Sequence, residues 1–267
     1  MDLNTITSYR YARTRDDLTL APGERIIAGG TWFFSEPQVD SSGVVDISTI
    51  GWPDLEDLPD DGLRIAATCP IATLADLPPR PAWHAQPLFF QCASALLASF
   101  KIWNVATVGG NVCRSFAAAS MVSLAAGLDG VAVVWRPDGS DYTVPVAELV
   151  TGNGTNTLSA GDVLRAIDIP GHAMRSRTGF RKIALAELGR SGAVVTGRRD
   201  EDDSMVFGIT AATGWPTVLR YPTVPEPAQL TDDIASADGY YTDPLGSADW
   251  RRGVSIVLAG EILSELS

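Results

Sequence analysis

The sequence predicts a mixed α+β protein built from more than one lobe. Short apolar runs of strand length and segments with helical spacing follow one another through most of the chain, and its C-terminal third adds closely spaced antiparallel strands. With 267 residues, 45% of them hydrophobic, the chain can form two lobes or one large domain with a small partner. Two Gly-Gly pairs far apart in the sequence, Gly29-Gly30 and Gly109-Gly110, each follow apolar residues and precede polar ones.

Residues 1–55 are predicted to form a small N-terminal lobe. Thr14 is expected to be the N-cap of a short helical start, because its hydroxyl can accept a main-chain hydrogen bond. Short buried strands are predicted at 25–28 and 44–47. An acidic, proline-containing linker is expected at 52–61.

Residues 56–172 are predicted to form a larger second lobe. Its helices follow from apolar residues at helical spacing, and its hairpin follows from Pro137-Asp138-Gly139-Ser140, a strong turn sequence between two apolar runs. In order, the predicted elements are a strand over 62–67, a short helix or turn over 73–77, a helix over 88–103, a helix over 120–128, a hairpin over 131–144, a surface loop over 151–156 and a strand over 163–169.

Residues 173–267 are predicted to form a C-terminal α+β domain. Antiparallel strands are expected at 180–184, 192–196 and 205–210, followed by an acidic loop rich in proline and a last helix over 250–266. The charged run 198–203 is expected to be a solvated hairpin tip.

Composition excludes several classes of function. A net charge of −12 and a pI near 4.5 argue against nucleic acid as a partner, although main-chain amides could still hold a small phosphate ligand. No apolar run reaches the roughly 18 residues of a membrane span, and the polar N-terminus does not predict a signal peptide, so a cytoplasmic location is expected.

The chain is poor in residues that bind metals. Its three cysteines, Cys69, Cys92 and Cys113, are widely spaced, whereas a [2Fe–2S] cluster usually takes four, so the chain cannot carry such a cluster alone. Its two histidines, His84 and His172, follow proline-containing loops and are expected to be exposed. No metal site is predicted.

The glycine pairs are the strongest functional signal. The first glycine segment is Ile26-Ile27-Ala28-Gly29-Gly30-Thr31, and the second is Ala106-Thr107-Val108-Gly109-Gly110-Asn111. Paired glycines can adopt positive φ, which lets successive N–H groups converge on an anion, and Thr107 and Asn111 add side chains that form hydrogen bonds. An isolated Gly-Gly is more often an ordinary turn between two helices, but two copies suggest two walls of one anion site.

No catalytic residue is predicted. The sequence contains no G-x-S-x-G elbow, no lysine of a P-loop and no G-x-G-x-x-G fingerprint. Such a pattern fits a bound cofactor that brings its own chemistry, while the protein captures its phosphates and orients it.

The two glycine segments resemble the flavin loops of the FAD-binding (medium) subunit of the molybdenum hydroxylases, the xanthine dehydrogenase and carbon monoxide dehydrogenase family. Three further stretches follow in the family's order, at Leu164 to Pro170, Phe180 to Lys182 and Gly246 to Arg252. The resemblance implies a two-lobed FAD-binding domain of the vanillyl-alcohol-oxidase-like (PCMH) type, followed by an antiparallel sheet with helices. FAD would lie in the cleft between the lobes.

The resemblance also implies site residues. Residues 28–32 and 107–111 would wrap the pyrophosphate, and the first loop would be flanked by Arg25, Ile26, Ile27 and Phe33. Cys113 would approach the flavin, and Leu164 and Lys182 would contact the cofactor from later strands. For Ile26, Ile27 and Leu164, plain core packing is the alternative. The implied cofactor-binding residues are Arg25, Ile26, Ile27, Ala28, Gly29, Gly30, Thr31, Trp32, Phe33, Ala106, Thr107, Gly109, Gly110, Asn111, Cys113, Ser120, Leu164 and Lys182.

Three positions depart from the family pattern. Trp103 stands where an arginine is usual, Ser120 replaces an aspartate near the ribose, and Arg190 is all that remains of a run of arginines. The implied function is an electron-transfer subunit that works with a molybdenum-cofactor subunit and a [2Fe–2S] subunit and passes electrons through FAD to NAD or another acceptor. The alternatives are a stand-alone flavin oxidase or reductase, and a scaffold subunit that has lost FAD, the latter motivated by Ser120 and Trp103.

Overall fold

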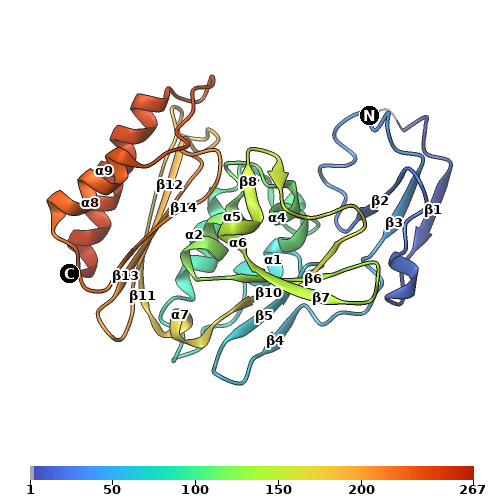
Figure 1. The fold of residues 1–267 in the computed structure, drawn as a ribbon, viewed down its shortest axis with the longest axis horizontal. Coiled ribbons are helices and arrows are strands. Elements are labelled where there is room, and N and C mark those ends of the chain that lie inside the picture. Colours follow the sequence, from blue (N-terminus) through green and yellow to red (C-terminus); the bar gives the residue numbers. More distant parts are fainter. Residues whose placement is uncertain (1–2) are drawn as a thin grey trace.

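The computed structural model describes residues 3–267 and places three larger sheets one after another along the molecule. The N-terminal sheet lies at one end, the C-terminal sheet with its two long helices lies at the other, and a sheet covered by short helices lies between them (Figure 1). We call these the N-terminal, central and C-terminal sheets. The residue boundaries predicted for the three segments, 1–55, 56–172 and 173–267, stay a prediction.

The N-terminal sheet is parallel, with β3 between β1 and β2. The predicted strands at 25–28 and 44–47 are confirmed, and β3 is buried along its whole length because it is the middle strand. The strand β1 was not predicted, because its polar and tyrosine side chains are largely exposed and show no apolar pattern. The strands are β1 (Ser8–Tyr11), β2 (Glu24–Ile27) and β3 (Gly43–Asp46).

The prediction that Thr14 caps a helix is wrong. The segment Asp16–Leu18 forms a single 3₁₀ turn with no side-chain cap, and the Thr14 hydroxyl donates to the carboxylate of Asp17 instead, at 3.0 Å. Asp17 also accepts the N–H groups of Arg13 and Thr14. The aspartate therefore organises this turn.

The central sheet is antiparallel in the order β4-β5-β10-β6-β7. Its strands confirm the predictions at 62–67, 131–144 and 163–169. The linker predicted at 52–61 is wrong in part, because Leu55–Asp57 pairs with β5 as an edge strand that is too short to show a pattern of its own. The strands are β4 (Leu55–Asp57), β5 (Leu63–Ala66), β6 (Val131–Trp135), β7 (Asp141–Pro145) and β10 (Val163–Ile169).

Short helices cover the central sheet and form the main hydrophobic core with it. The single helix predicted over 88–103 is wrong: α2 ends at Ala95, Leu96 has extended backbone angles (φ −72°, ψ 116°), and α3 begins only at Phe100. The predicted loop at 151–156 is a short hairpin whose turn uses Gly154 at φ +91°. The elements are α1 (Ile71–Ala75), α2 (Pro87–Ala95), α3 (Phe100–Trp103), α4 (Val108–Arg114), α5 (Ser120–Gly127), α6 (Val146–Leu149), β8 (Val150–Gly152) and β9 (Thr155–Asn156).

The C-terminal sheet is an antiparallel meander that lies between two helical layers. The helices α8 and α9 cover its outer face, and α5 of the central part packs on the other face (Figure 1). The predicted strands and the last helix are confirmed, whereas β14 and α8 were not predicted, because prolines flank both. The elements are α7 (Gly171–Arg175), β11 (Arg177–Ile183), β12 (Ala193–Arg199), β13 (Met205–Thr210), β14 (Thr217–Tyr221), α8 (Pro227–Ser236) and α9 (Ala248–Leu266).

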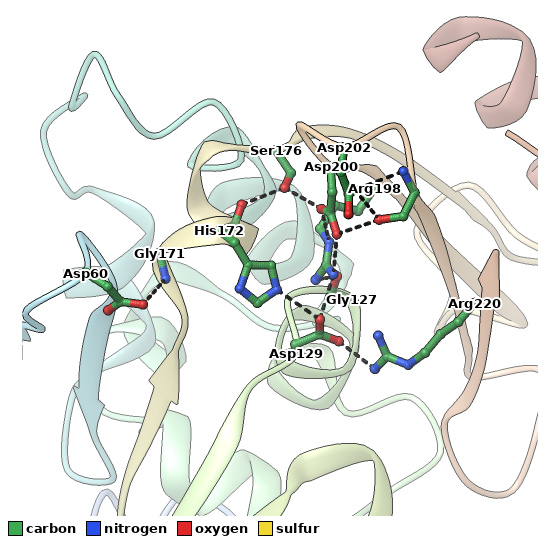
Figure 2. A network of polar contacts seen from close by, with 11 residues as sticks. Asp60, Gly127, Asp129, Gly171, His172, Ser176, Arg198, Asp200, Asp202 and Arg220 are labelled. Carbon is green, nitrogen blue, oxygen red and sulfur yellow. Dashed lines mark hydrogen bonds and ion pairs between the residues drawn. The ribbon is translucent and has the colours of Figure 1, made fainter. Parts of the chain in front are cut away.

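A buried arginine joins the central part to the C-terminal sheet. The prediction of a solvated tip is wrong for Arg198, which is only 2% exposed and donates to Asp129 at 2.6 Å and to Asp200 at 2.7 Å. Figure 2 shows Arg198 and Arg220 on either side of Asp129, which follows the end of α5. Only residues 200–203 of the charged run form the hairpin tip.

No helix in the described range 3–267 is long and apolar enough to cross a bilayer.

Candidate cofactor site

A cavity of about 790 Å³ opens between the N-terminal sheet and the helices that cover the central sheet. Residues of the segment that contains the C-terminal sheet also line it. This volume falls within the range of roughly 300–1,000 Å³ that is usual for ligand sites. Of the residues implied by the resemblance, Arg25, Ile26, Ile27, Ala28, Gly29, Gly30, Thr31, Trp32, Phe33, Ala106, Thr107, Gly110, Asn111 and Cys113 line it.

The two glycine segments approach each other closely in the wall of this cavity. A Cβ atom on Gly29 would lie 1.8 Å from the carbonyl oxygen of Val105 and 3.3 Å from the Cα atom of Ala106. Only glycine permits so close an approach of the two backbones. The two segments, about 80 residues apart in the sequence, therefore form adjoining walls of one cavity, as predicted.

The first glycine segment offers free main-chain donors. Gly30 adopts φ +64°, and the chain then turns so that the N–H of Phe34 donates to the carbonyl oxygen of Gly30. The N–H groups of residues 28–33 donate to no acceptor within the part of the chain that the structure describes. Because unpaired main-chain donors in a concave wall attract an anion, this segment suits a phosphate group.

The second glycine segment does not form the expected nest. Gly109 and Gly110 lie in the first turn of α4, which Thr107 caps, and neither has a positive φ. The N–H groups of this turn are all used internally, by Cys69 O, Ala67 O, Thr107 Oγ1 and Thr107 O, at 2.9–3.0 Å. The prediction of converging amides at Gly109-Gly110 is therefore wrong.

This second segment can still offer side chains to a ligand. Thr107 Oγ1 accepts from Gly110, which leaves its hydroxyl hydrogen free to donate. Asn111 Oδ1 accepts the N–H of Met121 at 2.9 Å, which fixes the amide and leaves its Nδ2 group without an acceptor among residues 3–267. Both side chains line the cavity.

Four of the implied residues do not line the cavity. Gly109 packs against Ala67, where its Cβ would lie 2.4 Å from the Ala67 side chain. Ser120 and Leu164 are 1% and 3% exposed in the core, and the Ser120 hydroxyl finds no partner among the described residues. Lys182 lies on β11, and its Nζ donates to the carbonyl oxygen of Ser94. The structure therefore does not bring these four residues to the site.

Arginine and aromatic side chains complete the cavity wall, and the residues implied by the resemblance did not include Arg114 and Phe116. The Arg114 guanidinium lies 4.9 Å from the ring centre of Trp32 and 4.7 Å from that of Phe116, distances typical of cation–π contacts. Burial lowers the pKa of Arg114 somewhat, and the charge of Glu36 opposes this shift. An arginine among small apolar residues directly after the second glycine segment was the signal available in the sequence.

The C-terminal part closes one end of the cavity with Arg190, Tyr241, Asp243 and Leu245. The Tyr241 hydroxyl donates to the carbonyl oxygen of Ala211 at 3.0 Å, and Asp243 forms an ion pair with the buried Arg251 at 2.5 Å. Burial raises the pKa of Tyr241, so this side chain stays a neutral donor. The sequence marked only Arg190, as the remainder of a run of arginines. No motif marked the other three, because their position depends on how the C-terminal sheet packs.

Comparison with protein families identifies the family of this chain. Residues 9–172, more than half of the chain, match the family model of the FAD binding domain in molybdopterin dehydrogenase. The chain belongs to this family. It is an oxidoreductase flavoprotein whose cofactor is FAD, and the predicted recognition is confirmed.

Solved structures agree with this fold over nearly the whole chain. A chain of quinoline 2-oxidoreductase from Pseudomonas putida 86 matches with a TM-score of 0.80 and 18% identity, covering 97% of this chain and 96% of that one. Reconstituted CO dehydrogenase from Oligotropha carboxidovorans matches with a TM-score of 0.81 and 17% identity, covering 97% of this chain and 96% of that one. Carbon monoxide dehydrogenase from Hydrogenophaga pseudoflava that lacks the Mo-pyranopterin moiety matches with a TM-score of 0.80 and 17% identity. The match covers 98% of this chain and 97% of that one. The predicted α+β flavin-domain fold is thus confirmed, and comparison with curated proteins gave no match.

The cavity residues fit FAD. Free N–H groups of residues 28–33 suit the diphosphate, and hydroxyl and amide donors of Thr107 and Asn111 suit phosphate or ribose oxygens. Aromatic and aliphatic side chains provide the apolar surface that flat rings require.

Proposed function

We propose that this chain is the electron-transfer subunit of a molybdenum-containing hydroxylase or dehydrogenase, and that it works within a hetero-oligomer. Electrons would arrive from [2Fe–2S] clusters on a partner subunit and leave to NAD or to another acceptor. One observation carries the proposal: two glycine segments distant in sequence line a single cavity whose first wall presents unpaired N–H groups.

The chain's own residues would bind and orient the cofactor. FAD, when bound, supplies the redox chemistry, and the protein supplies position and electrostatics. The N–H groups of residues 28–33 would hold the diphosphate, and Thr107 and Asn111 would add donors from the opposite wall. The cavity wall around the cofactor would be completed by Arg25, Ile26, Ile27, Ala106 and Cys113.

Partner subunits enter the proposal for two reasons. Three cysteines cannot supply the four thiolates that a [2Fe–2S] cluster usually takes, so the clusters would belong to another chain. In addition, the names of similar structures include CO dehydrogenase, one form of which is described as lacking the Mo-pyranopterin part of its molybdenum cofactor.

The cofactor part of the proposal is tested by a pair of glycine variants. Gly30→Asp places a carboxylate at the free N–H groups, and we expect it to abolish the stoichiometric flavin absorbance of the purified chain. Gly139→Asp is the matched control, because Gly139 also has a positive φ (+87°) but lies in the β6–β7 turn with nothing within 4 Å of its Cβ position. Full flavin content in Gly30→Asp would contradict the assigned site.

The partner part is tested by purifying the tagged chain from its native host and measuring molybdenum, iron and flavin. Stoichiometric molybdenum and iron would support the proposal. A metal-free chain that turns over NADH with an electron acceptor would favour a stand-alone flavin reductase. A colourless chain that takes up no added FAD would favour a scaffold subunit.

A further inference from the structure

Three solvent-exposed arginines that make no hydrogen bond to protein within residues 3–267 are gathered at the FAD cavity. Arg25, Arg114 and Arg190 line it, and none of them donates to a protein acceptor among the residues that the structure describes. Apart from Arg13, every other arginine of the chain does donate to a protein oxygen. A guanidinium carries five N–H donors and a permanent charge, so this distribution points to an anionic ligand in the cavity.

Arg114 is the cavity arginine whose position is best defined. It lies in the last turn of α4, packed against the rings of Trp32 and Phe116, which also contact each other at 4.7 Å between ring centres. Trp32 belongs to the stretch 28–33 whose N–H groups are free. The aromatic contacts therefore hold Arg114 against a side chain of the same stretch that carries the free main-chain donors.

The second glycine segment leaves a role for such a charge. Its first-turn N–H groups already have partners within the protein, so they cannot contribute to a diphosphate site from their side of the cavity. Packing against rings covers the faces of a guanidinium but leaves the donors at its edge, and these match two oxygens of a phosphate. The charge of Glu36 acts on Arg114, but no ion pair joins the two side chains.

We propose that Arg114 is a phosphate-binding residue of this site: held by Trp32 and Phe116, it bonds the diphosphate of FAD together with the free N–H groups of residues 28–33. This inference rests on the proposed cofactor site. It assigns to a side chain the role that the sequence pattern suggested for the amides of Gly109 and Gly110.

The test compares ligands that share or lack the diphosphate. The apo form of the full chain is titrated with FAD, with ADP and with riboflavin, for wild type, Arg114→Gln, Arg114→Lys and Arg13→Gln. Arg13 is the matched control, because it also lacks a protein acceptor but does not line the cavity.

For Arg114→Gln we expect the affinities for FAD and ADP to fall together by about ten- to hundred-fold, with the affinity for riboflavin unchanged, since a hydrogen bond to a charged group is lost. Arg114→Lys should lie between, and the salt dependence of ADP binding should weaken in Arg114→Gln.

Two results would overturn the inference. One is unchanged affinity of Arg114→Gln for FAD and ADP while wild type binds both. The other is an equal loss for riboflavin, which would mean that Arg114 acts by packing and not through the diphosphate. Thermal unfolding identifies a variant that fails to fold; Arg114→Lys, which keeps the charge, then decides the question. A wild-type chain that binds no FAD would instead refute the cofactor site itself.

Discussion

Gly29 and Gly30 are adjacent, but they require glycine for different physical reasons. Gly30 adopts φ +64°, a conformation that side chains with a Cβ atom disfavour. Gly29 has no positive φ, but its Cβ position lies 1.8 Å from the carbonyl oxygen of Val105. The first glycine therefore sets the distance between the cavity walls, and the second sets the direction of the chain.

Replacing Gly29 by alanine should push the two walls apart. We expect the free energy of unfolding to fall by about 1–3 kcal/mol, the usual cost of overpacking, and the FAD affinity to fall about tenfold or more. Urea unfolding and FAD titration measure the two effects. Gly253→Ala is the control and should lower neither value, because Gly253 is exposed on α9 with nothing within 4 Å of its Cβ position. A Gly29→Ala protein with wild-type stability and affinity would show that the close contact has no energetic role.

At the scale of elements, α4 shows how a helix replaces an expected turn. A Gly-Gly pair has weak helix propensity, yet Thr107 caps the helix and Val108 and Val112 are buried in the central core. Tertiary burial of these two valines outweighs the local preference of the glycines. The main-chain donors that the turn would have exposed are consequently used inside the protein.

The longest helix, α9, carries an avoidable local cost. It spans Ala248–Leu266 and includes Gly253 and Gly260, both exposed and both with nothing within 4 Å of their Cβ positions. Because glycine in a helix interior costs about 1 kcal/mol relative to alanine, the double variant Gly253→Ala/Gly260→Ala should be more stable by about 1–2 kcal/mol.

The expected rise in Tm for this double variant is about 2–4 °C for each kcal/mol in a chain of this size. Calorimetry on the apo protein checks it, and FAD affinity should not change, because neither glycine lines the cavity. A lower Tm would mean that these positions face a partner or that the helix is strained at them.

At the scale of the whole molecule, Asp129 links the central part to the C-terminal sheet. It accepts from Arg198 and from Arg220, each at 2.6 Å, and His172 lies 3.4 Å away (Figure 2). Arg198 also pairs with Asp200. Arg190 and Tyr241 line the cavity from the same C-terminal segment, whereas the junction residues do not line it.

The junction predicts a loss of stability in acid. Burial alone would raise the pKa of Asp129, but the hydrogen bond from Arg220 and the charge of Arg198 outweigh it and lower the pKa to about 2. A carboxylate with a lowered pKa stabilises the fold above its unfolded pKa of about 4 and loses that contribution as the pH falls towards 2. The contribution of the ionised carboxylate to the free energy of unfolding is on the order of 2 kcal/mol.

The variant Asp129→Asn isolates this effect. Asparagine tolerates the positive φ of residue 129 (+54°), so the backbone is kept while the charge is removed. We expect wild type to exceed the variant in free energy of unfolding by about 2 kcal/mol at pH 6, and the difference to shrink between pH 4 and 2. Urea unfolding at stepped pH measures it. A difference that stays constant down to pH 2 would contradict the lowered pKa.

Much of the fold could be predicted, because apolar runs and turn sequences in the chain indicate many of its strands. The strands β5, β10, β12 and β13 are apolar runs bounded by turns or charges, and the β6–β7 hairpin has its turn sequence. The edge strands β1, β4 and β14 and the helix α8 were missed, because their partners, and not their own composition, hold them in place.

The sequence by itself was enough to predict that two glycine segments share one site and that the chain follows the order of the FAD-binding family. Short-range residue order is enough for both, since it encodes turn chemistry and apolar periodicity. Only the tertiary structure decided which donors remain free: the amides of residues 28–33 do, those of the first turn of α4 do not, Arg198 is buried and Arg114 is unpaired. The reason is that a hydrogen-bonding group is satisfied or left open by residues distant in the chain, which no local pattern contains.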